Sequence, residues 1–286
     1  MRYEAPESLE GAVALLAGAK GEVRVLAGGT DLLVQMRADV VDPELIVDIK
    51  KIPETRTVTE EKGGWRIGAA VTGAELKEHT RLKQAWPGVV EAANLIGSTQ
   101  VQGRATLGGN LCNGSPAADS VPALIAAGAV ATLAGPKGRR DLPVEDVMLG
   151  PRKLALTKGE IVVSFLLPPR PPRSSDAYLR FIPRTEMDIA VVGAGVSLSL
   201  DAGGTITAAR VSLGAVAARV LLVSEAAQAI IGSRLDKAAQ DRLEAAARAA
   251  CRPIDDKRGT IEFRTDVAAV LTRRAALIAL DRARTN

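Results

Sequence analysis

The sequence predicts an α+β protein made of two closely packed domains, and three observations carry this prediction. The chain has 286 residues, of which 47% are hydrophobic, so it can fill two buried cores. Strand-like and helix-like segments run through the first 167 residues, and four prolines follow within residues 168–175. Beyond them, a hairpin leads into helices rich in Ala, Arg and Leu. We therefore expect domains at residues 1–172 and 173–286.

Periodicity predicts the elements in order. The first domain divides at about residue 54 into subdomains 1–54 and 55–172. The first subdomain has a helix over 7–19, capped by Ser8, and then a strand–helix–strand unit over 23–49. The second has a hairpin turning at residues 62–64, helices over 72–79, 86–96 and 121–129, and strands over 130–133 and 160–167. The C-terminal domain is predicted as a three-stranded antiparallel sheet (178–182, 189–200, 206–213) with helices over 225–231, 237–250 and 263–283 on one face.

Two glycine pairs stand out as candidate binding loops. Residues 25–32 read V-L-A-G-G-T-D-L, and residues 105–119 read A-T-L-G-G-N-L-C-N-G-S-P-A-A-D. Glycine turns leave backbone N–H groups unpaired and unshielded, which suits a phosphate. We expect each pair to follow an apolar strand, with Thr30, Thr106 and Asn110 adding side-chain donors. Either loop alone could be a plain tight turn, whereas the two together could hold a diphosphate.

The other candidate residues are weaker indications of a functional site. Asp119 could cap the following helix or accept from ribose hydroxyls, and His79, the only histidine, is interpreted as a solvated helix end. Cys112 in the second loop could be redox-active, but we interpret it as a small buried side chain. The Gly193–Gly195 segment lacks a third glycine and continues as a strand pattern, so it is not a Rossmann fingerprint. No catalytic triad, paired carboxylates or metal-ligand cluster is present, which suggests that a bound cofactor does the chemistry.

Composition excludes several classes of protein. Two widely spaced cysteines argue against a disulfide framework, a zinc site or an iron–sulfur cluster in this chain. The net charge of +4 comes from interleaved charges and aromatic residues are only 2%, so we expect no nucleic-acid partner. No apolar run is long enough for a membrane span and no signal-peptide pattern opens the chain, so we expect a cytoplasmic location.

At these loops the chain resembles the FAD-binding medium subunits of the molybdenum hydroxylases, the family of carbon monoxide dehydrogenase, xanthine dehydrogenase and 4-hydroxybenzoyl-CoA reductase. The similarity covers the whole length. Four motifs carry it in order: A-G-G-T-D at 27–31, T-L-G-G-N at 106–110 with S-P-x-x-D at 115–119, E-I-V at 160–162, and R-x-x-x-D-I-A at 184–190. The [4Fe–4S] loop of the benzoyl-CoA reductase branch is excluded by the two lone cysteines.

The resemblance implies a two-part FAD-binding domain of the vanillyl-alcohol-oxidase (PCMH) type and a small C-terminal α+β domain. By the family motifs, the first loop would hold the FAD diphosphate and neighbouring groups through Val25, Leu26, Ala27, Gly28, Gly29, Thr30, Asp31 and Leu32. The second would do so through Thr106, Leu107, Gly108, Gly109 and Asn110. Asp119 would lie near the ribose or adenine, Ile96 and Val162 would line the flavin, and Arg180 matches a lysine near the cofactor in xanthine dehydrogenases. Because His79 lies outside both loops, we expect non-covalent FAD.

The resemblance further implies an electron-transfer subunit. Its partners would be a small subunit with [2Fe–2S] clusters and a large molybdopterin subunit, in a dimer of heterotrimers, and its electron acceptor could be NAD+, a quinone or oxygen. Two alternatives stay open: a stand-alone FAD oxidase or dehydrogenase of the same fold, and a flavin-less scaffold subunit. Against the stand-alone enzyme, the sequence shows no side-chain cluster suited to deprotonating a substrate. A flavin-less scaffold subunit would be colourless when purified.

Overall fold

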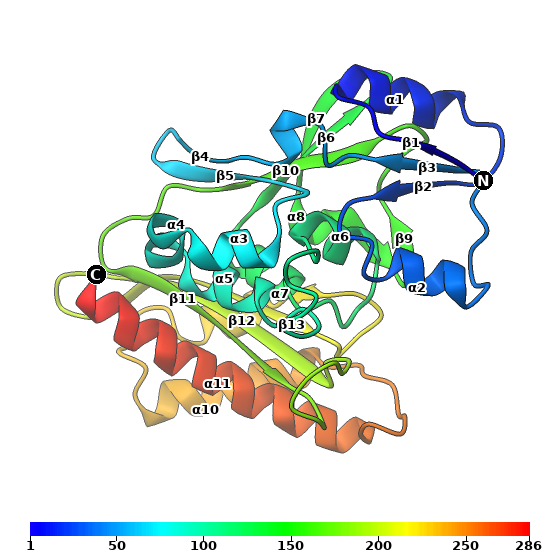
Figure 1. Cartoon of the computed structure of the whole chain (residues 1–286). Helices are drawn as coiled ribbons and strands as arrows, with labels where there is room; N and C mark the ends of the chain where they lie inside the picture. Colours follow the sequence, from blue (N-terminus) through cyan, green and yellow to red (C-terminus); the bar gives the residue numbers. More distant parts are fainter.

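A computed structural model describes all residues, 1–286, and begins with a small parallel sheet (Figure 1). Its strands are β1 (Arg2–Glu4), β2 (Val23–Leu26) and β3 (Leu45–Asp48), in the order β1-β3-β2. Helices α1 (Leu9–Gly18) and α2 (Leu32–Arg37) make the connections. Ser8 caps α1 by accepting a hydrogen bond from the N–H of Gly11, as the sequence predicts. The expected strand–helix–strand unit is confirmed, because β2 and β3 pair in parallel and α2 connects them.

The second sheet is antiparallel and has the order β4-β5-β10-β6-β7. Its strands are β4 (Val58–Glu61), β5 (Gly64–Gly68), β6 (Val130–Gly135), β7 (Gly138–Pro143) and β10 (Ile161–Leu167). The central strand β10 is almost wholly buried, which explains its continuous apolar sequence. The hairpin predicted to turn at residues 62–64 is β4–β5, so that prediction is confirmed.

Short helices connect the strands of this half. They are η1 (Pro53–Thr55), α3 (Gly73–Glu78), α4 (Thr80–Ala85), α5 (Pro87–Ala93), α6 (Leu107–Cys112), α7 (Val121–Ala126) and α8 (Val144–Val147), followed by the two-stranded ribbon β8 (Met148–Gly150) and β9 (Lys153–Leu154). Thr72 caps α3 through a reciprocal capping box with Glu75. His79 is a capping residue, because its Nδ1 accepts a hydrogen bond from the N–H of Leu82 at the start of α4.

The C-terminal sheet has four strands, so the prediction of three was one short. Its order is β11 (Ser174–Phe181), β12 (Val192–Leu200), β13 (Ile206–Gly214) and β14 (Leu221–Leu222). The missed strand β14 has only two residues, too few to show an alternating pattern. Gly193 and Gly195 lie inside β12, which confirms that they form no strand-to-helix nucleotide turn. The remaining helices are α9 (Ser224–Gln228), α10 (Lys237–Ala250) and α11 (Ile261–Thr285).

Helices cover both faces of this sheet, whereas the sequence suggested only one. Helix α11 packs on β11 and β12, and α10 packs on α11. On the opposite face lie α5 and α7 from the N-terminal half, which pack against β11 and against β12 and β13. In Figure 1, α5 and α7 lie between the upper sheets and the β11–β13 layer. The two halves therefore share an extensive packed boundary.

Candidate functional site

The loop between β2 and α2 presents a run of free backbone donors. None of the N–H groups from Gly28 through Leu32 donates a hydrogen bond to another atom of the chain. The Gly29 carbonyl accepts from Leu33 and the Asp31 carbonyl accepts from Gln35, so the chain turns directly into α2. Successive unpaired N–H groups in a turn form a concave site for an anion. The sequence-based expectation of free donors is confirmed for this loop.

Both glycines of this first loop are required by the geometry. A Cβ on Gly28 would lie 2.1 Å from the backbone oxygen of Arg104, so this loop packs directly on the segment that precedes the second glycine pair. Gly29 has a φ of +77°, which side chains disfavour. The two glycine loops, far apart in sequence, are thus in backbone contact.

The second loop differs from the prediction in two respects. Gly108 and Gly109 do not follow a strand, because residues 101–104 are turns and both glycines lie in the first turn of α6. Their N–H groups are also occupied: Gly108 donates to the Ala69 carbonyl (3.1 Å) and Gly109 to the Thr106 hydroxyl (3.0 Å). This loop therefore offers side chains instead of a run of backbone donors. The Asn110 side chain accepts from the backbone N–H and hydroxyl of Ser120 (2.9 and 2.7 Å), which leaves its NH₂ group free.

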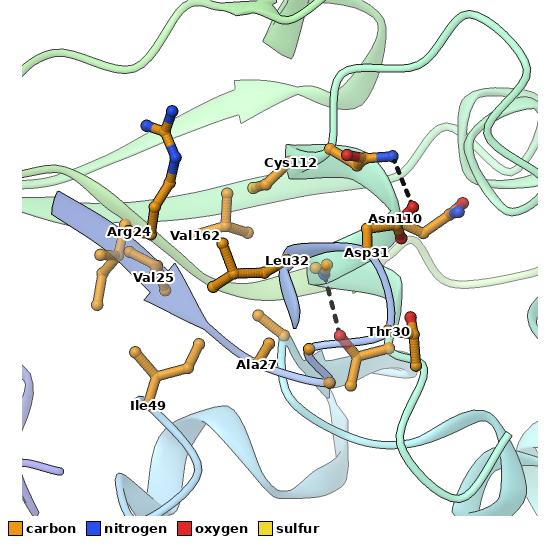
Figure 2. Close-up of a pocket in the computed structure, with 18 of the residues that line it drawn as sticks. Arg24, Val25, Ala27, Thr30, Asp31, Leu32, Ile49, Asn110, Cys112 and Val162 are labelled. Carbon is orange, nitrogen blue, oxygen red and sulfur yellow. Dashed lines mark hydrogen bonds between the residues drawn. The ribbon is translucent and has the colours of Figure 1, made fainter. Parts of the chain in front are cut away.

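The two loops line one cavity of about 390 Å³ (Figure 2). That volume is typical of small-molecule sites, and 14 of its 27 lining residues are hydrophobic. In Figure 2 the polar side chains of Thr30, Asp31 and Asn110 gather at the right, and Val25 and Ile49 lie at the left. The predicted site residues that line the cavity are Val25, Ala27, Gly28, Gly29, Thr30, Asp31, Leu32, Ile96, Thr106, Gly108, Gly109, Asn110 and Val162.

The other four predicted residues do not line this cavity. Leu26 and Leu107 are buried in the interior. Asp119 and Arg180 form an ion pair with each other (2.8 Å), with side chains only 12% and 6% exposed. Asp119 is not a cap, because Ser120 holds the N-cap position of α7. Burial raises the pKa of the Asp119 carboxyl to about 6, although the Arg180 guanidinium opposes that rise.

Hydrogen bonds join the two loops across the cavity wall. Asn113, just after α6, donates to the Asp31 carboxylate (3.1 Å) and accepts from the side chain of Gln35 in α2 (3.1 Å). Cys112 also lines the cavity, and its side chain is exposed, so the interpretation as a buried residue was wrong. The α6 helix turns this residue toward the cavity instead of the core.

Sequence reasoning missed part of the cavity wall. The missed lining residues are Val23, Arg24, Gln35, Val41, Ile49, Ala69, Ala105, Cys112, Asn113, Arg152, Leu154, Leu156, Glu160 and Ile161. Those from Arg152 to Leu156 surround the two-residue strand β9, which has no detectable period. Glu160 could have been found, because it opens the predicted strand over 160–167 and directly precedes the observed strand β10. Hydrogen bonds from Arg140 (2.7 and 2.8 Å) lower the pKa of Glu160 to about 2, so this carboxylate is charged and already paired.

The arrangement fits an elongated ligand with an anionic part and an apolar part. The free N–H groups suit phosphate oxygens, and the apolar wall suits rings. No group of three or more His, Cys, Asp and Glu side chains lies close enough together to hold a metal ion. No helix combines the length and the apolar character needed to cross a membrane. The fold and cavity thus define a protein that can bind a phosphate-bearing cofactor.

Comparison with known proteins identifies the family. Residues 1–170 match the family model of the FAD binding domain in molybdopterin dehydrogenase, and residues 177–279 match that of the CO dehydrogenase flavoprotein C-terminal domain. The chain belongs to this family of FAD-binding medium subunits of molybdenum hydroxylases.

Relatives and solved structures agree with that assignment. The chain is 34% identical to the carbon monoxide dehydrogenase medium chain of Afipia carboxidovorans, over 99% of this chain and 97% of the relative. It is 30% identical to the xanthine dehydrogenase FAD-binding subunit of Escherichia coli O157:H7, over 95% and 93%. A solved Cu,Mo-CO dehydrogenase superposes with a TM-score of 0.94 at 34% identity, over 99% and 98% of the two chains. Quinoline 2-oxidoreductase from Pseudomonas putida 86 gives 0.89 at 28% identity, with the same coverage.

Proposed function

We propose that this chain is the FAD-carrying electron-transfer subunit of a molybdenum-dependent hydroxylase or dehydrogenase. It would take electrons from a [2Fe–2S] partner subunit and pass them to an external acceptor such as NAD+, a quinone or oxygen. The run of unpaired N–H groups from Gly28 to Leu32 on an apolar cavity is the observation that carries the proposal. Bound FAD would supply the ability to exchange one or two electrons.

The donors present fit the cofactor. The N–H groups of the first loop would hold the diphosphate, and the free NH₂ group of Asn110 and the hydroxyl of Thr30 would add donors. The buried side chains of Ile96 and Val162 would contact the flavin. Asp119 and Arg180 lie outside the cavity wall, so their assignment as cofactor ligands stays a prediction. The expected non-covalent attachment is part of the proposal.

We also propose the assembly and the domain division. The relatives are named medium chains or subunits of dehydrogenases, which supports a multi-subunit complex. The partners proposed here are a small [2Fe–2S] subunit and a large molybdopterin subunit, in a dimer of heterotrimers. The change from β10 to the β11 sheet near residue 172 supports domains at 1–172 and 173–286, with subdomains meeting at about residue 54. The cytoplasmic location stays a prediction.

The visible spectrum of the purified chain, recorded before and after acid precipitation, tests the proposal. Flavin absorption that passes fully into the acid supernatant is the expected result. Colour that stays in the pellet would show a covalent link and favour the stand-alone oxidase. A colourless chain that takes up no added FAD would overturn the proposal and favour the scaffold alternative.

A further inference from the structure

The side chain of Lys50, just after β3, reaches back to the first glycine loop. Its ammonium group donates to the Ala27 carbonyl oxygen at 3.0 Å and to both carboxylate oxygens of Asp48, at 2.9 and 2.8 Å. Ala27 directly precedes Gly28, the first residue of the loop with free N–H groups. Lys50 itself does not line the cavity.

The partner carboxylate is firmly held. Asp48 is 5% exposed and accepts a hydrogen bond from the Tyr3 hydroxyl at 2.6 Å and another from the backbone N–H of Lys50 at 2.9 Å. Burial alone would raise the pKa of Asp48, but the hydrogen bonds from Lys50 and Tyr3 outweigh it and lower the pKa overall. The carboxylate is therefore ionised and fixes the position of the ammonium group, whose charge it neutralises.

The hydrogen bond from Lys50 to the Ala27 carbonyl also fixes the direction of the Gly28 N–H. The carbonyl of Ala27 and the N–H of Gly28 belong to one planar peptide unit, and the chain contains no cis peptide bond. In a trans peptide the C=O and the N–H point in opposite directions. A hydrogen bond that fixes the carbonyl on the Lys50 side therefore fixes the N–H on the other side. Gly28 lines the cavity, and its N–H is free of any partner in the chain.

No hydrogen bond other than that from Lys50 holds the Ala27–Gly28 peptide plane. Gly28 has no side chain, Gly29 is in the left-handed region, and no N–H of the loop is tied to another group. We propose that Lys50 is a positioning residue of the cofactor cavity, which aims the Gly28 N–H at a phosphate oxygen of the bound ligand by holding the Ala27 carbonyl. The inference rests on the proposed function, since the ligand is the FAD diphosphate.

The test uses the full chain, freed of flavin and titrated with FAD. Lys50→Met removes the donors, Lys50→Arg keeps a donor, and Lys51→Met is the matched control, because Lys51 is exposed and makes no hydrogen bond or ion pair. Flavin fluorescence gives the dissociation constant, and ³¹P NMR reports the environment of the bound diphosphate. We expect Lys50→Met to weaken FAD binding about tenfold, the factor that about 1.4 kcal/mol represents, and to shift the ³¹P resonances. Lys50→Arg should restore most of the affinity, and Lys51→Met should match the wild type.

A double variant separates positioning from stability. Lys50→Met leaves the buried Asp48 without its cation, whereas Lys50→Met with Asp48→Asn removes both charges. The inference expects the double variant to bind FAD as weakly as Lys50→Met even where its melting temperature recovers. Affinity that recovers with the melting temperature would overturn the inference, as would a single variant with wild-type affinity and unchanged ³¹P resonances. Wild-type protein that takes up no FAD would overturn the proposed function and the inference with it.

Discussion

At the residue scale, Asp119 is the carboxyl whose surroundings shift its pKa furthest upward. Burial raises this pKa from 3.8 to about 6, against the opposing effect of Arg180. Between these two values the folded chain holds a proton that the unfolded chain has lost. Asp119 therefore contributes stability that is complete below about pH 4 and is lost as the pH rises through about 6.

The Asp119→Asn variant cannot lose that contribution. We expect its unfolding free energy, relative to that of the wild-type apoprotein, to increase between pH 4 and pH 7, by up to about 3 kcal/mol. Urea denaturation of both proteins across that range gives the difference directly, because other titrating groups cancel. A difference that stays flat with pH would show that Asp119 keeps an ordinary pKa in the folded chain.

Gly28 is the position in the first loop at which an added side chain has the least room. A methyl group there would overlap the Arg104 carbonyl oxygen at 2.1 Å. We expect Gly28→Ala to destabilise the chain by about 1–3 kcal/mol and to abolish measurable FAD binding, because the loop must move off the second loop. Gly103→Ala, in the adjacent turn with no atom within 4 Å of the added Cβ, is the control. Calorimetry and an FAD titration check both, and equal behaviour of the two variants would contradict the close approach.

At the scale of elements, the sequence predicted the longer segments well. The helix expected over residues 237–250 coincides with α10, because it has a capping Asp236 and a clear apolar face. The first loop was predicted with its free donors, because a strand, two glycines and a helix follow one another locally. The second loop was misread for two reasons. The Gly108 N–H donates to Ala69, a tertiary contact that local sequence does not encode. The Gly109 N–H donates to Thr106, which is the N-cap of α6 and a local signal that was overlooked. Strand β14 and the β9 wall of the cavity are too short to have a period.

The link between α2 and α6 is another feature that only tertiary structure reveals. Asn113 contacts Asp31 and Gln35 across 78 to 82 residues of sequence. We expect Asn113→Ala to speed FAD release a few-fold, because two partly exposed hydrogen bonds that join the loops are lost. Release can be timed by trapping freed FAD with an excess of an FAD-specific apoflavoprotein. Gln100→Ala, an exposed amide without hydrogen bonds, should release FAD at the wild-type rate, and the same rate in Asn113→Ala would show that the link does not restrain the cavity.

At the scale of the whole molecule, the C-terminal half braces the half that holds the cavity. Arg282 of α11 pairs with Glu91 of α5 (2.5 and 3.1 Å) and donates to the Asp176 carbonyl. Arg210 of β13 pairs with Glu145 of α8 (2.7 Å) and donates to the Ile125 carbonyl. Because the Arg282–Glu91 pair and both contacts of Arg210 cross the boundary, the two halves should unfold together.

Gly88 in α5 is one point of close approach across this boundary. Its N-terminal position in the helix faces β11: an added Cβ would lie 2.6 Å from the Asp176 carboxylate and 2.9 Å from the backbone of Ala177. The N–H of the next residue, Val89, donates to that same carboxylate at 3.1 Å. We expect Gly88→Ala to destabilise the chain by about 1–3 kcal/mol, because α5 must shift away from the C-terminal sheet.

The control for Gly88→Ala is Gly18→Ala at the end of α1, where no atom lies within 4 Å of the added Cβ. Scanning calorimetry should show one transition for the wild type and for Gly18→Ala. For Gly88→Ala it should show a lower melting temperature, with the transition broadened or split as the two halves uncouple. If Gly88→Ala melted like Gly18→Ala, the contact between α5 and β11 could not be what makes the halves fold as one unit.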